Sequence, residues 1–169
     1  MAPLRQRGVT LIELMIGIFI MAMLLMAALP LGQYWVNSNR QMQARGLMWE
    51  AVSQARAMAL RNPSARRAAE PSATLRLSNG RLEVVVPDND TPLWSAVVRQ
   101  DVTFKLVDGG GFADAGSMGT SSNPTLDCIN FDSRGLRLPG AGGCSDSSGT
   151  LGQIAVGLAN QDPLYVDML

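Results

Sequence analysis

Few side chains in this sequence could do chemistry, and they form no familiar catalytic pattern. The 169 residues include no histidine, which excludes Ser-His-Asp and Cys-His catalysis and any imidazole metal ligand. Asp88, Asp90, Asp127 and Asp132 could form a metal or acid–base cluster. However, Asp88 and Asp90 lack the glycine and the glutamate of a calcium-binding loop, and the sequence has no phosphate-binding loop or nucleophile elbow. We therefore interpret these aspartates as solvated turn residues and predict a protein that is not an enzyme and has no cofactor or metal.

The most unusual carboxylate is Glu13, because it stands inside a long apolar block. Residues 9–36 include 22 hydrophobic residues out of 28, and Glu13 carries their only charge. The 23 uncharged residues 14–36 are long enough as a helix to cross a hydrocarbon core of about 30 Å. Arg5 and Arg7 precede the block, which favours a cytoplasmic N-terminus. A cleaved signal peptide and an uncleaved signal anchor both fit the block, but neither explains a carboxylate that costs about 2.5–3.5 kcal/mol within a membrane.

A third interpretation of this block explains Glu13. Residues 7–14, with the letters RGVTLIEL, resemble the class III signal of type IV prepilins and type II secretion pseudopilins. The resemblance implies that residues 1–8 are a leader, that prepilin peptidase cuts between Gly8 and Val9, and that the new amine of Val9 is methylated. Val9 stands where this family usually has Phe or Met. Glu13 becomes the fifth residue of the mature chain, where it can pair with the N-terminal amine of a neighbouring subunit in the filament.

Pro30 also fits the pilin-like interpretation. It is the twenty-second residue after the expected cut, where pilins commonly have a proline. Proline removes a helical hydrogen bond and clashes with the preceding turn. Two outcomes stay open: Pro30 kinks or locally melts the helix, or it ends the membrane-spanning helix.

Residues 37–62 are expected to continue as an amphipathic helix after the membrane-spanning residues 9–36. Small residues and methionines recur at helical spacing and form one stripe, made of Ala44, Leu47, Met48, Ala51, Ala55, Met58 and Ala59. We expect this stripe to pack on the protein's own β-sheet, the alternative being a partner protein. Asn62-Pro63 should end the helix. Residues 54–62 resemble the end of this helix in the GspH/FimT family of pilin-like proteins.

Residues 63–169 are predicted to form a β-rich head, so that the whole chain is an α+β, pilin-like protein with a mainly antiparallel sheet. Asn79-Gly80 predicts a hairpin between residues 74–78 and 81–86. Residues 93–98 and 102–107 are a second candidate pair, and residues 108–123 are expected to be a long loop. Further candidate strands are residues 126–131, 136–138, 153–158 and 164–168, the last as an edge. The stretch from Phe131 to Gly135 resembles the strand and turn of the same family.

The two cysteines, Cys128 and Cys144, are expected to pair if the head lies in the periplasm. That compartment is oxidising, and a bridge across 16 positions stabilises a fold by about 3 kcal/mol in the chain-entropy model. The alternative is two buried thiols.

The resemblance implies a structural function, that of a minor pilin or pseudopilin in a type IV pilus or a type II secretion pseudopilus. Such a subunit acts in filament initiation at the tip. The implied partners are prepilin peptidase, other minor and major pilins or pseudopilins, the inner-membrane assembly platform and inner-membrane lipid. The expected location is the inner membrane, with a single span, a cytoplasmic N-terminus and a periplasmic head.

An alternative function is DNA binding for natural transformation. Some relatives of FimT bind DNA through a Gly-Arg-x-Arg motif, and Arg134-Gly135-Leu136-Arg137 is a permuted version of it. Residues 62–169 hold eight basic and twelve acidic residues, and a net charge of −4 attracts phosphate only weakly. Solvated turn arginines are the simpler interpretation of Arg134 and Arg137.

Overall fold

The computed structural model describes residues 9–146, 149–158 and 160–168, and the chain divides into two compact units, Met1–Val36 and Asn37–Leu169. A single helix, α1 (Leu11–Arg61), begins in the first unit and ends in the second. By length and composition it can cross a membrane. The helix continues through Pro30, so the interpretation that Pro30 ends it is wrong. The leucine, alanine and methionine residues around Pro30 favour helix strongly enough to tolerate one missing hydrogen bond.

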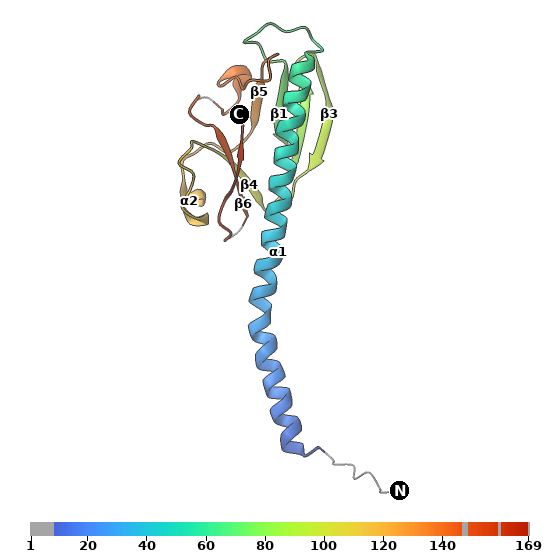
Figure 1. Cartoon of the computed structure of the whole chain (residues 1–169), viewed down its shortest axis with the longest axis vertical. Coiled ribbons are helices and arrows are strands. Elements are labelled where there is room, and N and C mark those ends of the chain that lie inside the picture. The colour runs from blue at the N-terminus through green and yellow to red at the C-terminus, as the bar shows by residue number, and fades with distance from the viewer. Residues whose placement is uncertain (1–8, 147–148, 159, 169) are drawn as a thin grey trace, which may run out of the picture. The chain divides into compact units, whose positions relative to one another are not determined.

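The C-terminal half of α1 covers the core of the head, as its periodicity predicts (Figure 1). Leu47 and Met58 of the predicted stripe are half-buried. Its other members are at most 5% exposed and belong to the main hydrophobic core: Ala44, Met48, Ala51, Ala55 and Ala59. Alanines at this interface let the helix approach the strands closely, while Met48 fills the space between them.

The end of α1 also agrees with the sequence. The helix stops at Arg61, and Asn62 follows with a φ of 43° in the left-handed region. The side chain of Asn62 accepts a hydrogen bond from the Arg66 amide and donates one to the Arg66 carbonyl, both at 2.8 Å. Asn62 therefore both terminates the helix and closes the following turn.

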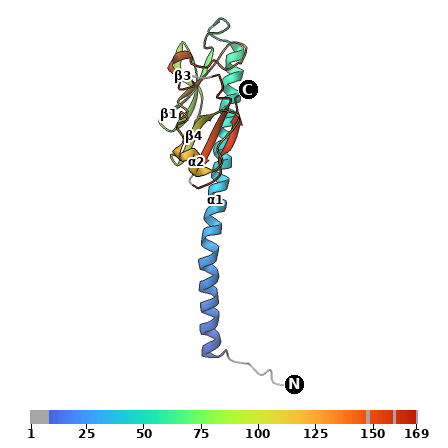
Figure 2. The ribbon, with the colours of Figure 1, turned by 90° about the vertical axis from the view of Figure 1, so that its left-hand side faces the viewer.

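The head contains two antiparallel sheets. Four strands lie in the order β3-β2-β1-β5: β1 (Ala73–Ser78), β2 (Arg81–Val86), β3 (Asn89–Val97) and β5 (Cys128–Phe131). Three strands lie in the order β4-β6-β7: β4 (Val102–Val107), β6 (Gln153–Leu158) and β7 (Leu164–Asp167). Figures 1 and 2 show the C-terminal half of α1 running along the first sheet, and the second sheet lies next to the first. Asn79 and Gly80 both have positive φ, which confirms the predicted β1–β2 hairpin with its tight turn.

The predicted pairing of residues 93–98 with 102–107 is wrong, because these strands belong to different sheets. β3 pairs with β2, and β4 pairs with β6. Residues 104–107 of β4 are buried without alternation, so this strand needs cover on both faces. β4 is an edge strand of the second sheet, and backbone hydrogen bonds join its outer side to Pro124 and Leu126.

Two further expectations about the head are corrected. The predicted loop 108–123 contains a short helix, α2 (Ala115–Thr120), whose first turn is closed by reciprocal hydrogen bonds between Asp114 and Ser117. Met118 of α2 is buried in a small second core. Residues 136–138 form no strand, because only Arg137 bridges to Phe131.

Candidate functional site

The first turn of α1 is closed by Thr10 and Glu13. Oε2 of Glu13 accepts hydrogen bonds from the amide and the hydroxyl of Thr10, both at 3.0 Å, and the Thr10 hydroxyl accepts one from the Glu13 amide at 3.3 Å. This reciprocal pattern is a capping box, in which an acidic group also faces the positive end of the helix dipole. The spacing Thr-x-x-Glu is a sequence signature of this cap, whereas Glu13 was predicted only to pair with an amine of another subunit. Gly8 lies outside the described residues, and Val9 is 74% exposed just before the cap.

The apolar residues that follow this cap are not covered by any described part of the chain. The large apolar side chains described between Val9 and Trp35 are each more than half exposed. A surface of this kind is stable in water only when lipid or other protein covers it.

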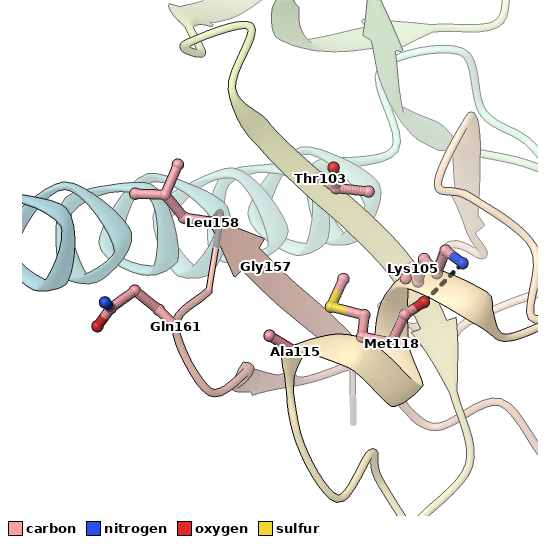
Figure 3. Close-up of a pocket in the computed structure, with 8 residues that line it drawn as sticks. Thr103, Lys105, Ala115, Met118, Gly157, Leu158 and Gln161 are labelled. Carbon is pink, nitrogen blue, oxygen red and sulfur yellow. Dashed lines mark hydrogen bonds between the residues drawn. The ribbon is translucent and has the colours of Figure 1, made fainter.

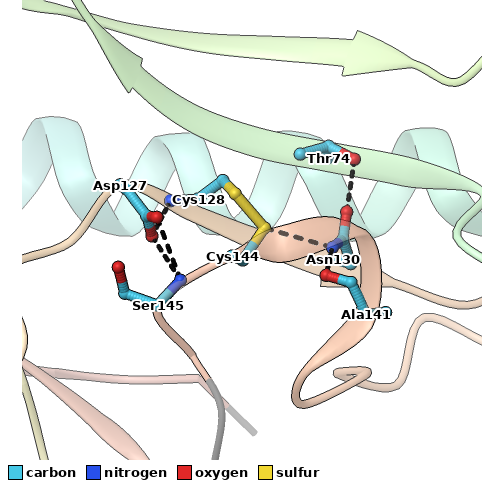
Figure 4. The surroundings of a disulfide bond; sticks show 7 residues. All are labelled: Thr74, Asp127, Cys128, Asn130, Ala141, Cys144 and Ser145. Carbon is cyan, nitrogen blue, oxygen red and sulfur yellow. Dashed lines mark hydrogen bonds between the residues drawn. A yellow bond between two sulfur atoms is a disulfide. The ribbon is translucent and has the colours of Figure 1, made fainter.

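In the head, the two cysteines are joined in a disulfide, and Figure 4 shows the polar groups around it. The carboxylate of Asp127 accepts the amide of Ser145 at 2.8 and 3.0 Å. The side-chain amide of Asn130 donates to the carbonyl of Ala141 at 2.7 Å. Burial would raise the pKa of Asp127, but the hydrogen bonds from Ser145 and from the Cys128 amide outweigh it and lower that pKa. The disulfide and these hydrogen bonds hold the segment after residue 139 against β5.

Arg137 binds the same part of the chain through a nearly buried side chain. Its guanidinium lies 2.8 Å from Oδ1 of Asp146 and also donates to the carbonyls of Leu151 and Gly149. The side chains of Arg137 and Asp146 are only 12% and 1% exposed. Burial raises the pKa of Asp146, Arg137 partly opposes this shift, and nearby Asp127 adds to it.

Arg134, the other arginine considered for DNA, is 62% exposed and lies 2.8 Å from Oδ2 of Asp132. Oδ1 of Asp132 also accepts hydrogen bonds from the backbone amides of Arg134 and Leu136, each at 2.9 Å, and these bonds close the turn after β5. Burial would raise the pKa of Asp132, but hydrogen bonds from the Leu136 amide and from Arg134 outweigh it and lower that pKa. Both arginines thus have carboxylate partners within the head. The interpretation of Arg137 as a solvated turn arginine is wrong, because its side chain is nearly buried.

The aspartates considered as a catalytic or metal cluster are not brought together. Asp88 pairs with Arg66 and Asp90 with Arg76, Asp127 binds the distant Ser145 amide, and Asp132 closes the turn after β5. Asp132 is fully buried, so the prediction of a solvated residue is wrong for it. Within the described ranges, no three Asp, Glu, Cys or His residues gather in a way that could hold a metal ion.

A pocket of about 200 Å³ lies between α2 and the second sheet (Figure 3). The buried Lys105 lines it and donates to the carbonyls of Met118 and Ser121 and to the Ser121 hydroxyl, at 2.8–3.1 Å. Three acceptors use all three ammonium protons, so Lys105 serves to fasten the end of α2 to β4.

A comparison with protein families found a match in the N-terminal segment of the chain. Residues 3–29 match the family model described as the prokaryotic N-terminal methylation motif. The chain matches none of the curated proteins and none of the solved structures with which it was compared. The matched segment contains Gly8, Val9 and the capping pair, and it supports a type IV pilin-like protein with a class III prepilin signal. This signal and the apolar N-terminal helix suggest that the protein is anchored in a membrane.

Proposed function

We propose that this protein is a minor pilin or pseudopilin of the GspH/FimT type, a structural subunit of a type IV pilus or a type II secretion pseudopilus. The observation that carries the proposal is the match of residues 3–29 to the N-terminal methylation motif. The protein is inserted in the inner membrane with a cytoplasmic N-terminus, residues 9–36 in the membrane and a periplasmic head of residues 63–169 joined by the amphipathic residues 37–62. It then enters the filament with other pilins or pseudopilins through the assembly platform and acts in initiation at the tip.

Processing by prepilin peptidase agrees with the local structure. The expected cut between Gly8 and Val9 lies two residues before α1 begins. Thr10 caps the helix from the mature side of the cut, so removal of residues 1–8 leaves the first turn closed. The methylated amine of Val9 is then four residues from Glu13.

In the filament, Glu13 has two roles in this proposal. Its carboxylate caps its own helix through Thr10, and it also neutralises the positive amine of a neighbouring Val9. A carboxylate has enough acceptor sites for both interactions. Pairing the two charges in an apolar filament core favours one docking register.

The proposal is tested by N-terminal mass spectrometry of the full chain expressed with prepilin peptidase. Wild type should lose residues 1–8 and gain one methyl group, whereas Gly8→Ala should keep its leader. Glu13→Ala should be cut normally but should be depleted from sheared filaments, while the exposed-carboxylate control Glu70→Ala should be incorporated like wild type. An uncut wild-type chain would refute the proposal.

The geometry favours this structural function over DNA binding. Arg137 is almost buried against Asp146, and Arg134 is paired with Asp132. The full chain in detergent micelles should therefore give no mobility shift of duplex DNA at low salt. A shift that disappears in Arg134→Ala would support DNA binding instead.

A further inference from the structure

A small pocket lies where the chain enters the head, between α1 and the connection from β3 to β4. Its volume is about 140 Å³, and its lining residues all belong to the second compact unit, which begins at Asn37. Its polar lining consists of Arg40, Gln43 and Arg99, and no described carboxylate lines it. Val97, which is 65% exposed, is one of its apolar walls. We call this site the Arg40 pocket.

Arg40 is a half-buried cation that has no partner in the described part of the chain. A guanidinium carries five N–H groups, and that of Arg40 donates no hydrogen bond to a described residue and forms no ion pair with one. The other described arginines without such a partner for the guanidinium, Arg61 and Arg67, are exposed to water. A partly buried guanidinium with unused donors favours the binding of an anion, because charge-assisted hydrogen bonds to it are strong.

Arg99 adds a second guanidinium, which is only partly used. Its Nε and Nη2 donate to the two carboxylate oxygens of Asp101 at 3.1 and 3.2 Å, so three of its five N–H groups stay free of that carboxylate. The hydrogen bond from Arg99 lowers the pKa of Asp101, and the charge of Arg40 acts in the same direction. Two arginines and one ionised aspartate leave a net charge of about +1, which matches the single negative charge of a phosphodiester.

The sequence places this pocket close to lipid headgroups. Tyr34 and Trp35 stand near the end of the uncharged residues 14–36, and such aromatic rings prefer the headgroup level of a membrane. Arg40 follows Trp35 by five residues, which span at most about 18 Å in any conformation. Whatever the angle between the two units, the first turn of the head therefore stays near the headgroups whenever residues 14–36 lie in a membrane.

We propose that the Arg40 pocket binds the phosphodiester of an anionic phospholipid in the leaflet next to the head. Arg40 and Arg99 donate to the phosphate oxygens, and Val97 contacts the carbons beside them. Asp101 is already bound by Arg99, so no carboxylate of the pocket is left for the ammonium group of a zwitterionic lipid. The site goes beyond the proposed function, since it requires only that the chain is anchored in a membrane.

Lipid titrations of the full chain in detergent micelles, followed by native mass spectrometry, test this site. Wild type should retain one phosphatidylglycerol in preference to phosphatidylcholine. Arg40→Gln should bind phosphatidylglycerol about tenfold more weakly, and its melting temperature should not change because no partner in the described chain is lost. Arg99→Gln should weaken binding at least as much, because it leaves the Asp101 carboxylate uncompensated beside the pocket.

Arg61→Gln is the matched control, because it removes the same charge from the other end of the head portion of α1. The two positions are 21 residues apart, or about 32 Å along a helix, so Arg61→Gln should bind lipid like wild type. A general attraction between basic residues and anionic headgroups would weaken both variants equally. That result, or an Arg40→Gln variant that binds like wild type, would overturn the inference.

Inorganic phosphate distinguishes a lipid site from a site for a free anion. Phosphate at the same concentration as the lipid should not displace phosphatidylglycerol, since it lacks the apolar contacts and the diester's single charge. Displacement by phosphate, or equal retention of phosphatidylcholine, would show that the site does not select an anionic lipid. None of these measurements requires cleavage or assembly, so their failure would leave the proposed function standing, whereas an uncut wild-type chain would refute that function alone.

Discussion

Replacing Arg137 with methionine should destabilise the head strongly while leaving its shape nearly unchanged. Methionine keeps much of the apolar stem but removes the guanidinium that lies 2.8 Å from the buried carboxylate of Asp146. Removing one partner of a buried ion pair costs about 3–5 kcal/mol, because the other charge stays buried without compensation. The lost hydrogen bonds to Leu151 and Gly149 act in the same direction.

The assay is thermal and urea unfolding of the full chain in detergent micelles, followed by near-ultraviolet circular dichroism. For a domain of this size, 1 kcal/mol corresponds to about 3–5 °C, so the melting temperature should fall by about 10–20 °C. The double variant Arg137→Met/Asp146→Leu removes both charges and should recover at least half of the loss. A fall of less than about 2 °C for the single variant, or a double variant no more stable than the single one, would refute the reasoning.

The same pair gives a pH dependence whose sign can be worked out. Burial raises the pKa of Asp146 above its unfolded value, so the folded state binds this proton more readily than the unfolded state. Stability from this group therefore falls as pH rises from the unfolded pKa through the raised folded pKa. Without Arg137 the pKa rises further, and the stability difference between variant and wild type should shrink as pH is lowered from 7 to about 4.5. The pKa values of Asp127 and Asp132 are lowered, so their contributions to the free energy of unfolding are lost on acidification. This loss occurs in both proteins and therefore cancels in the stability difference.

Two other changes in the head have definite expected outcomes. Replacing Cys128 and Cys144 together with serine should lower the free energy of unfolding by about 3 kcal/mol, measured by urea unfolding, and reducing agent should affect wild type but not this variant. Gly135→Ala should lower it by about 1–2 kcal/mol, because Gly135 has a φ of +73° and an added Cβ would lie 3.2 Å from Cγ of Leu60. The control Gly109→Ala, with open space around it, should change stability little, and equal losses in both alanine variants would contradict this explanation.

Several elements could be predicted because their signals are local. The stripe from Ala44 to Ala59 repeats at the helical period, so its burial follows from the spacing alone. Asn79-Gly80 selects a tight turn, which sets the register of β1 against β2. The capping boxes at Thr10 and Asp114 are also local signals, but neither was predicted from the sequence.

The strand order could not be predicted in the same way. β4 and β6 are about 50 residues apart in sequence, and no local pattern says that they pair. β4 follows β3 after a short connection, which made a hairpin the simplest expectation. In the second sheet, the residues from Phe104 to Val107 are buried on both faces of the strand. This burial depends on the whole core and not on the local sequence.

The sequence by itself determined the N-terminal signal, the apolar segment, the buried stripe of α1 and the first hairpin, because each depends on residue types at short fixed spacings. Only the tertiary structure decided what the polar residues of the head do. Arg137 is buried against Asp146, and Asp127 binds the Ser145 amide, because strands and turns from different parts of the chain converge there. The groove between Trp49 of α1 and Leu164 of β7 is likewise a product of the fold, since residues more than 100 positions apart line it.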